Sequence, residues 1–377
     1  MKTIKQIGNI KNKVVFVRVD YNVPIVNNKV ADPFRIISSI PTIDYLKKKG
    51  AKVVLIAHLE PKEGASDSLI PVARYLNRKT KIKFFANNEL GKIQDEIKKM
   101  KDGEVLLLEN IRKFPGEKAN DIKLAKDFAK MGDFYVNDAF SVSHRAHMSL
   151  VGIPKYLPSF AGFQLEKEIK NLSSALNTKK HPFVFILGGS KFSTKMPLVK
   201  KYLKNADCVF LGGALVNSFF KAMGYEVGKS LVDDTDPKIL LKLINNKKLC
   251  LPIDVMVVDD KGNSRSCKPN ELKSNESTMD VGPLSVKLLE PMLTNAKLIL
   301  WNGPLGKYES SLGVVSTKSV LKILSNVKGE TIIGGGDTVD LVNEMKIADK
   351  FTFVSTGGGA ALDFLANGTL PGIKALR

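Results

Sequence analysis

Residues 331–342, TIIGGGDTVDLV, pass from a strand pattern to a helix pattern across three consecutive glycines. The β-branched run before the glycines is apolar on both faces, as expected of a strand buried inside a sheet. Asp337 and Thr338 then open an amphipathic pattern that predicts a helix. The glycines fit either a cradle for nucleotide phosphates or an ordinary turn between the two elements.

The same alternation of strand and helix recurs along the 377 residues. Amphipathic stretches such as 40–50, IPTIDYLKKKG, separate short apolar runs. These predicted strands lie at 13–20, 51–58, 104–110, 133–140, 183–189, 207–213, 253–260, 297–303, 330–336 and 351–359. Runs that are apolar on both faces and alternate with helices predict parallel sheets covered on both sides. We therefore expect an α/β protein with two doubly wound, Rossmann-like parallel-sheet domains.

A chain of this length predicts two domains, and the segment 164–180 lies between the two groups of strands. Four apolar side chains recur in it at helical spacing, namely Leu165, Ile169, Leu172 and Leu176. This pattern predicts a connecting helix. The expected domains are 1–163 and 181–365, joined by a helical hinge that could act as a lever for domain closure.

Composition narrows the class of protein. Apolar residues make up 44% and charged residues 25% of the chain, and no apolar stretch is long enough to span a bilayer. The N-terminal sequence lacks the apolar core of a signal peptide, so a cytoplasmic location is expected. Cys208, Cys250 and Cys267 lie far apart without metal-ligand spacing and are predicted to be reduced thiols.

The net charge of +20 would attract phosphate-bearing partners, nucleic acid included. The lysines, however, are scattered over predicted helix faces, without the interleaved aromatic residues of single-strand binders. We interpret them as a solvated surface and keep a polyanion-binding or nucleic-acid-binding protein as an alternative. That alternative predicts tight, salt-sensitive binding to duplex DNA.

The residues that follow the predicted strands differ between the two halves of the chain. Polar and charged side chains end the strands of the first half: Arg18, Asp20, Asn22, His58, Glu109, Asn110, Arg112, Asn137 and Asp138, with His144, Arg145 and His147 close behind. Glycines end the strands of the second half, in GGSK, GGAL, WNGP, GGGDT and STGGG. Because ligands bind at the carboxyl ends of parallel strands, each half is expected to carry a site.

The two kinds of strand end suit two kinds of ligand. Guanidinium groups grip carboxylate and phosphate through paired hydrogen bonds, so the first half suits a small, multiply anionic molecule. Bare backbone and helix N-termini suit the phosphates of a bulkier nucleotide. Two substrates on two domains are therefore expected. A dinucleotide-dependent dehydrogenase is disfavoured, because no GxGxxG motif opens a helix with an acidic residue about 20 residues later.

Ten ordered motifs resemble those of phosphoglycerate kinases: RVDYNVP, LENIRKFPGE, NDAFSVSHRAH, LEKEIKNLSSAL, LGGSKFSTK, GYEVGKSL, VGPLSV, LILWNGPLG, GGGDT and VSTGGGAALDFL. The resemblance covers nearly the whole chain. It implies reversible phosphoryl transfer between 1,3-bisphosphoglycerate and ADP, giving 3-phosphoglycerate and MgATP. It also implies a monomer in which an N-terminal domain, completed by the tail 366–377, binds the glycerate and a C-terminal domain binds the nucleotide.

The resemblance implies a phosphoglycerate site made of Asp20, Tyr21, Asn22, Arg35, His58, Leu59, Lys62, Arg112 and Arg145. Asp20 and Asn22 would position the hydroxyl and carboxyl end of the glycerate, and the basic residues would hold the phosphate that is not transferred. Arg35 is similar to the family's catalytic arginine, which steadies the group in flight. Such a transfer needs positioning and charge neutralisation rather than a general base.

The implied nucleotide site comprises Lys191, Lys195, Gly212, Gly213, Asn302, Glu309, Gly335, Gly336, Asp337 and Thr338. Lys191 and Lys195 stand four residues apart at a predicted helix start, where both could reach phosphate oxygens, in a string that lacks the spacing of a P-loop. Asp337 would meet Mg²⁺ carried by the nucleotide phosphates. The residues expected to act in catalysis are Arg35, Lys191, Gly336 and Gly358.

One motif departs from the family. The family usually has HLGRP after the second strand, whereas this chain has HLEPKEG at 58–64, without the glycine and the arginine. Either Lys62 replaces that arginine or the site works with one guanidinium fewer, and weaker, less oriented binding of the glycerate is expected. An inactive kinase homologue is the alternative that this loss supports. In addition, KYE at 307–309 stands for the usual VFE, which bears on the placement of Glu309.

Overall fold

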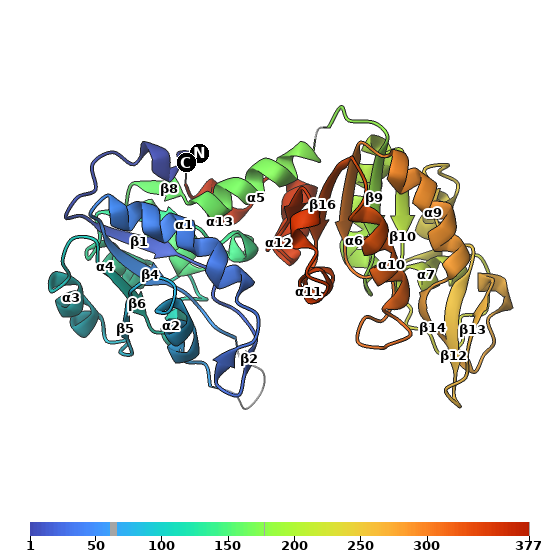
Figure 1. Cartoon of the computed structure of the whole chain (residues 1–377), viewed down its shortest axis with the longest axis horizontal. Helices are drawn as coiled ribbons and strands as arrows, with labels where there is room; N and C mark the ends of the chain where they lie inside the picture. The colour runs from blue at the N-terminus through green and yellow to red at the C-terminus, as the bar shows by residue number, and fades with distance from the viewer. Residues whose placement is uncertain (61–65, 177, 377) are drawn as a thin grey trace. The chain divides into compact units, whose positions relative to one another are not determined.

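The computed structural model describes residues 1–60, 66–176 and 178–376, and the chain divides into two compact units. The first unit comprises Met1–Lys170 together with the end of the chain from Thr369, and the second comprises Asn171–Gly368. Helix α5 (Phe163–Ser174) runs across the boundary. Each unit is built on a six-stranded parallel sheet flanked by helices, which confirms the predicted α/β fold class (Figure 1).

The sheet of the first unit has the strand order β5-β6-β4-β1-β7-β8. Its strands are β1 (Val14–Arg18), β4 (Lys52–Ile56), β5 (Lys83–Phe85), β6 (Val105–Leu108), β7 (Phe134–Asn137) and β8 (Ser159–Ala161). Its main helices are α1 (Phe34–Lys48), α2 (Ile70–Leu76), α3 (Leu90–Lys98) and α4 (Ile122–Ala129), and a short hairpin is formed by β2 (Ile25–Val26) and β3 (Lys29–Val30).

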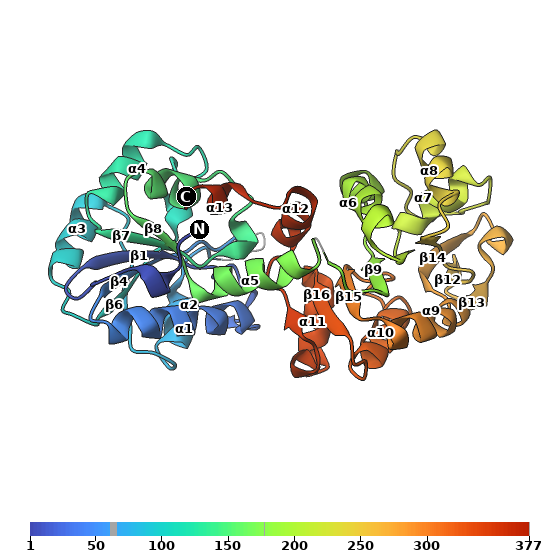
Figure 2. The same ribbon diagram turned by 90° about the horizontal axis from the view of Figure 1, so that it is seen from above.

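Alternate residues of β1 pack against helices on opposite faces of this sheet. The ring of Phe16 packs on Phe128 of α4, with 6.1 Å between the ring centroids. Val15 and Val17 instead cluster with Ile36 of α1. Figure 2 shows α1 and α4 on the two sides of the sheet. The run VVFVR is apolar on both faces for this reason, since each face meets a helix.

The end of the chain returns to the first unit. In α13 (Pro371–Lys374), the backbone N–H of Gly372 donates to the carbonyl of Ser143 at 2.8 Å, and its carbonyl accepts from the Asn137 side chain at 3.3 Å. Thr3, near the N-terminus, pairs with Ala161 of β8. Both termini therefore lie on the same unit, as Figure 1 shows.

The sheet of the second unit has the strand order β11-β10-β9-β15-β16-β17. Its strands are β9 (Phe183–Leu187), β10 (Cys208–Leu211), β11 (Leu249–Cys250), β15 (Leu298–Asn302), β16 (Glu330–Gly334) and β17 (Phe353–Val354). Its helices are α6 (Phe192–Asn205), α7 (Leu215–Ala222), α8 (Pro237–Ile244), α9 (Pro283–Asn295), α10 (Val315–Leu324), α11 (Gly336–Glu344) and α12 (Gly359–Asn367). Figure 2 shows α6 and α10 on opposite sides of its strands.

One predicted strand belongs elsewhere. The stretch 253–260 was expected in a parallel sheet, but its residues form β12 (Val255–Asp259) in a separate antiparallel sheet with β13 (Ser264–Cys267) and β14 (Glu276–Val281). Only one face of β12 is fully buried, because Val255 and Val257 point inward while their neighbours stay partly exposed. The apolar run was too short to distinguish one buried face from two, so the parallel prediction was wrong here.

The order of the strands places one reversal of winding in each sheet. In the first unit the chain proceeds from β1 toward β4 on one side and from β7 toward β8 on the other. In the second unit it proceeds from β9 toward β10, and from β15 toward β16. Such reversals open a crevice beyond the carboxyl ends of the two central strands. The crevices lie beside Arg18 and Asn137 in the first unit, and beside Leu187 and Asn302 in the second.

No helix within the described ranges is both long and apolar enough to cross a membrane.

Asp138, which follows β7, holds the start of α5. Its carboxylate accepts hydrogen bonds from the backbone N–H groups of Gln164 at 2.8 Å and Leu165 at 3.3 Å. Burial raises the pKa of Asp138 from an ordinary 3.8 to about 6. The unfolded chain therefore loses this proton at a lower pH than the folded chain. Between those two values, the contribution of Asp138 to folding stability falls as the pH rises.

Replacing Asp138 by Asn keeps an oxygen acceptor for both amides and removes the ionisation. As the pH rises from 4 to 7, we expect the free energy of unfolding of Asp138→Asn to increase relative to that of the parent protein by up to about 3 kcal/mol. Denaturant unfolding of both proteins at several pH values measures this difference. Asp95→Asn, at an exposed position on α3, controls for the loss of one carboxylate. A difference between Asp138→Asn and the parent that does not change with pH would contradict the expectation.

Candidate active site

The strand ends of the first unit bring together the basic residues predicted from the sequence. Asp20 and Asn22 follow β1, His58 follows β4, and Arg112 follows β6. Arg145 comes from the loop after β7. We call this group, with Arg18 and His147, the arginine edge. It lies at the carboxyl ends of the strands, where the reversal between β1 and β7 opens the sheet.

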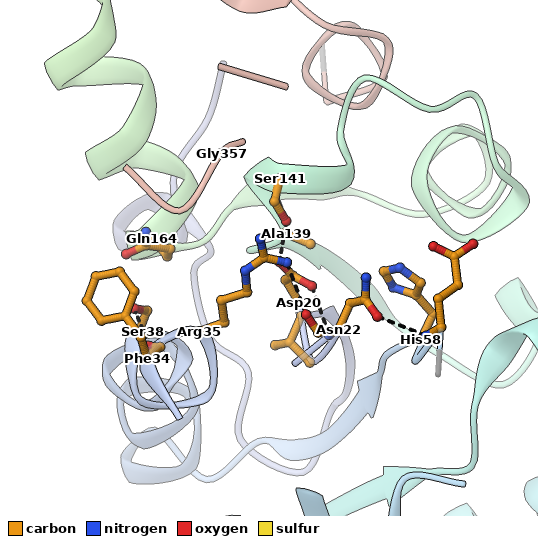
Figure 3. Close-up of polar contacts among 12 residues, drawn as sticks. Asp20, Asn22, Phe34, Arg35, Ser38, His58, Ala139, Ser141, Gln164 and Gly357 are labelled. Carbon is orange, nitrogen blue, oxygen red and sulfur yellow. Dashed lines mark hydrogen bonds and ion pairs between the residues drawn. The ribbon is translucent and has the colours of Figure 1, made fainter. Parts of the chain in front are cut away.

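Arg35 is anchored at the arginine edge by Asp20 and Asn22. Its Nη1 lies 3.0 Å from the Asp20 carboxylate and donates to the Asn22 carbonyl at 3.1 Å. The Ser141 hydroxyl and the Asn22 backbone N–H both donate to Asp20. Figure 3 shows the guanidinium of Arg35 directed at Asp20. Because Arg35 is the second residue of α1 and 30% of its side chain stays exposed, its guanidinium is both oriented and accessible.

His58 offers a buried donor. Arg18 is itself buried, and its guanidinium lies 3.1 Å from Nδ1 of His58. Because an arginine can only donate, Nδ1 accepts and the ring proton lies on Nε2. Burial, with the charges of Arg18, Arg112 and Arg145, holds the pKa of His58 well below its usual value, so the ring is neutral. Its buried Nε2–H has no hydrogen-bond partner among the residues that the structure describes.

Positive charge accumulates beside His58. Arg112 has an exposed side-chain fraction of only 8%, and its buried Nε also lacks a hydrogen-bond partner in the described part of the chain. Burial lowers the pKa of Arg112, and the charge of Arg145 lowers it further. Burial and the three guanidiniums of this edge lower the pKa of His147 to about 4. Buried donors without acceptors beside crowded cations indicate a site for an anionic ligand.

Two carboxylates face these cations. Glu117 is buried and is held by the N–H of Ser149 at 2.8 Å and its hydroxyl at 2.6 Å. Glu60, directly after Leu59, forms an ion pair with Arg112, and its Oε2 lies 3.7 Å from Nη1 of Arg145. No sequence motif indicated that Glu60 would reach both guanidiniums.

Two residues predicted for this site have side chains that lie elsewhere. The Tyr21 side chain is buried in the core, and its hydroxyl lies 3.1 Å from that of Ser39. Leu59 is buried in the same core cluster. Both side chains belong to the core rather than to the arginine edge. Lys62 lies outside the described residues. Arg18 was noted only as a strand end, although it orients His58.

The strand ends of the second unit form a second group, which we call the glycine edge. Most of its glycines serve the packing of neighbouring turns. A Cβ at Gly303 would stand 2.5 Å from the Gly188 carbonyl oxygen, and one at Gly213 would stand 2.8 Å from backbone atoms of Gly189. A Cβ at Gly335 would lie 2.8 Å from the Gly303 nitrogen. These glycines are required because the turns touch backbone to backbone.

Three glycines at this edge are different. Gly336 begins α11, and Gly358 and Gly359 begin α12. A Cβ at any of them would meet nothing within 4 Å. The first turn of a helix presents backbone N–H groups that lack a partner one turn earlier in the helix, together with the positive end of the helix dipole. Open space at two helix N-termini suits oxygens of an anion, such as a phosphate.

Charged side chains surround the start of α11. Burial and the charge of Glu309 raise the pKa of Asp337, while a hydrogen bond with Tyr308 and the charge of Lys195 oppose this. Lys195 belongs to α6, and its side chain folds back over the turn that precedes α6. A Cβ at Gly189, in that turn, would stand 2.6 Å from Nζ of Lys195. Burial lowers the pKa of Lys195. Asp337, Glu309 and Lys195 are thus close neighbours at the glycine edge.

The remaining predicted residues of this edge have distinct environments. Lys191 is the N-cap residue of α6, and its side chain is exposed. Asn302 ends β15 and is buried beside Gly334. Thr338 is buried, and its hydroxyl has no hydrogen-bond partner among the described residues. Gly212 packs on Leu305, to which a Cβ at Gly212 would come within 2.6 Å.

A cavity of about 440 Å³ opens beside the glycine edge. Its walls include Gly213, Leu305, Tyr308, Glu309 and Asp337. Asn217 of α7 also lines it, and the Oδ1 of this buried side chain has no partner in the part of the chain that the structure describes. Apolar walls with a few polar groups are typical of a small-molecule pocket. Asn217 was not among the residues predicted from the sequence, although it is a lone amide in an apolar stretch, among Leu215, Val216, Phe219 and Phe220.

Comparison with known proteins agrees with this geometry. The family model described as phosphoglycerate kinase matches residues 4–368. The phosphoglycerate kinase of Borreliella afzelii is 40% identical over 391 residues, covering 100% of this chain and 99% of the relative. That of Pseudothermotoga lettingae is 41% identical over 389 residues, covering 99% of this chain and 98% of the relative.

Solved structures match over the same extent. The phosphoglycerate kinase of Coxiella burnetii has a TM-score of 0.85 and 35% identity, with 99% of this chain and 98% of that chain covered. The enzyme from Pyrococcus horikoshii OT3 has a TM-score of 0.88 and 30% identity, with coverages of 100% and 98%. Because the family model, the relatives and the structures all span almost the whole chain, this protein belongs to the phosphoglycerate kinase family.

Proposed function

We propose that this chain is an active phosphoglycerate kinase, which transfers a phosphoryl group reversibly between 1,3-bisphosphoglycerate and ADP to give 3-phosphoglycerate and MgATP. The proposal is carried by two buried donors at the arginine edge, His58 Nε2–H and Arg112 Nε–H, which have no acceptor among the residues that the structure describes. They fit a small anion that brings its own acceptor oxygens. The second unit has a site of different construction, as a second substrate requires.

In this proposal the arginine edge binds the glycerate. Arg112, Arg145 and His58 hold the phosphate that is not transferred, with Lys62 as a further cation. Asp20 and Asn22 orient the hydroxyl and carboxyl end, and the backbone at Tyr21 and Leu59 supports them. Arg35 steadies the group in flight, because its guanidinium is held by Asp20 and still accessible. The glycerate domain would be 1–163 with the tail 366–377.

The glycine edge binds the nucleotide in a domain of 181–365. Gly212 and Gly213 flank the base beside the cavity, and Asn302 and Glu309 lie toward the ribose and phosphates. Lys191, Lys195, Gly335, Gly336 and Thr338 receive the phosphates, and Gly358 lies near the group that is transferred. The open space at the Cβ position of Gly336, at the N-terminus of α11, supports this assignment.

The site fits a magnesium ion that arrives with the nucleotide. Among the described residues, no group of three or more acidic, histidine or cysteine side chains gathers to hold a metal. Asp337 presents a half-buried carboxylate at the start of α11. One carboxylate together with phosphate oxygens and water is the usual setting of Mg²⁺ in phosphoryl transfer. Bound there, Mg²⁺ would neutralise charge on the phosphates.

The chain's own residues then act through position and charge. The attacking group is an ionised carboxylate or diphosphate, so no general base is required. A loose transition state spreads negative charge over the transferred oxygens, which Arg35, Lys191 and the helix N-termini are suited to neutralise. The connecting helix expected over 164–180 is shorter in the structure, where α5 ends at Ser174. Closure of the two domains through this connecting segment, a monomeric state and a cytoplasmic location are further expectations.

The proposal is tested by a coupled assay with 3-phosphoglycerate, ATP and Mg²⁺, in which we expect turnover. Absence of turnover in folded protein would favour an inactive homologue, and tight, salt-sensitive binding to duplex DNA would then favour the polyanion-binding alternative.

Arg35→Ala should lower kcat by roughly 10³-fold or more, if Arg35 stabilises charge in the transition state. Thermal unfolding of the variant checks that it folds. Arg74→Ala, at an exposed arginine on α2, removes the same charge from the same unit and should keep its turnover. A change confined to KM in Arg35→Ala would reduce Arg35 to a binding residue.

Gly336→Ala and Gly303→Ala separate the two kinds of glycine. The methyl of Gly336→Ala enters open space at the start of α11, so the fold is kept while kcat/KM for ATP falls by at least about tenfold. Gly303 has a φ of +88° and no room, so Gly303→Ala should lose about 1–3 kcal/mol of folding stability.

Gly91→Ala serves as the control for this pair, because Gly91 lies in α3 with nothing within 4 Å of its Cβ position. Its turnover should match that of the parent, and its melting temperature should not fall, because alanine favours a helix more than glycine does. Undiminished turnover in Gly336→Ala would remove this helix start from the nucleotide site.

A further inference from the structure

Glu60 reaches into the arginine edge from its rim. Its side chain is 44% exposed, whereas that of its ion-pair partner Arg112 is only 8% exposed. The other carboxylate oxygen lies 3.7 Å from Nη1 of Arg145. One carboxylate therefore faces the two guanidiniums that the proposed function assigns to the phosphate of the glycerate.

A hydrogen bond from its own backbone holds Glu60 in this place. The N–H of Glu60 donates to Oδ1 of Asn22 at 2.8 Å. Asn22 is also the residue whose carbonyl accepts from Arg35. Glu60 is thus tied to the network that surrounds the site, while its side chain stays free to rotate toward solvent because it is nearly half exposed.

The charge of Glu60 partly balances a crowded group of cations. Burial and Arg145 lower the pKa of Arg112, and the nearby carboxylate of Glu60 raises it. A carboxylate and a phosphate present similar oxygens to a guanidinium, so both compete for the same donors. A phosphate that binds Arg112 and Arg145 must therefore displace Glu60.

We propose that Glu60 is an internal competitor for the phosphate of the glycerate substrate. In the unliganded protein its carboxylate occupies Arg112 and Arg145, and it turns outward when the phosphate binds. The inference rests on the proposed function. Its consequence is a weaker apparent affinity, because only the fraction of molecules with Glu60 displaced can bind phosphate. The family's usual glycine and arginine are missing before residue 62, which also weakens binding of the glycerate. Glu60 therefore adds to an effect of the same sign.

Glu60→Gln keeps the size of the side chain and removes its charge. We expect the Kd of the full-length variant for 3-phosphoglycerate, measured by calorimetry at fixed ionic strength, to fall about three- to tenfold. The Kd for inorganic phosphate should fall by a similar factor, and the KM for 3-phosphoglycerate should fall with it. Glu60→Ala, which also removes the oxygen that Gln could still offer to Arg112, should bind at least as tightly as Glu60→Gln.

The control is Glu89→Gln, which removes one carboxylate from an exposed ion pair with Lys92 at the start of α3. It changes the net charge equally, so its Kd values should stay within about twofold of the parent's if the effect of Glu60 is local. Unchanged or weaker binding in both Glu60 variants would overturn the inference and make Glu60 a brace that orients Arg112. An equal tightening in Glu89→Gln would also overturn it.

The experiment separates this inference from the proposed function. Turnover by the parent protein tests the function and does not involve the variants. If the parent shows no turnover, tighter binding of inorganic phosphate by the Glu60 variants still supports competition at Arg112 and Arg145, and unchanged binding still rejects it.

Discussion

Parallel pairing with one reversal of winding in each sheet is the constraint on which the sites depend. It brings the ends of β1 and β7 together in one unit and those of β9 and β15 in the other. Residues that are more than a hundred positions apart, such as Arg18 and Asn137, thereby stand side by side. Because all strands of a sheet run in the same direction, the polar ends of the first sheet lie at one edge of that sheet, and the glycine-rich ends of the second lie at the corresponding edge of the other.

The two edges handle negative charge in different ways. At the arginine edge, burial of His58 and His147 and the charges of the neighbouring guanidiniums depress the pKa of both histidines. Buried donors without an acceptor among the described residues remain there for a ligand to satisfy. The glycine edge instead offers backbone N–H groups at helix starts, with Lys195 and Asp337 nearby. A compact phosphate with a carboxylate suits the first construction, and a chain of phosphates that carries a metal ion suits the second.

The sequence was sufficient for the alternation of strands and helices and for the sorting of polar and glycine-rich strand ends. It failed where one pattern serves two structures. The apolar run at 253–260 fits a buried parallel strand, yet it forms an antiparallel one with a single buried face. Short edge strands such as β8 and β11 carry too few residues to show a period.

The glycines of the site are ambiguous in the same way. The sequence alone does not distinguish Gly303, which is packed against Gly188, from Gly336, which faces open space. Contacts made by Glu60 and Arg18 depend on side-chain reach across several strand ends and had no sequence signal.

The assignment of one substrate to each edge is tested most directly by NMR titration of the isotope-labelled full chain with 3-phosphoglycerate and, separately, with MgADP. We predict that 3-phosphoglycerate shifts the Nε–H resonances of Arg112 and Arg145 and leaves the Gly336 amide in place, and that MgADP does the reverse; shifts by both ligands at the same edge would contradict the assignment.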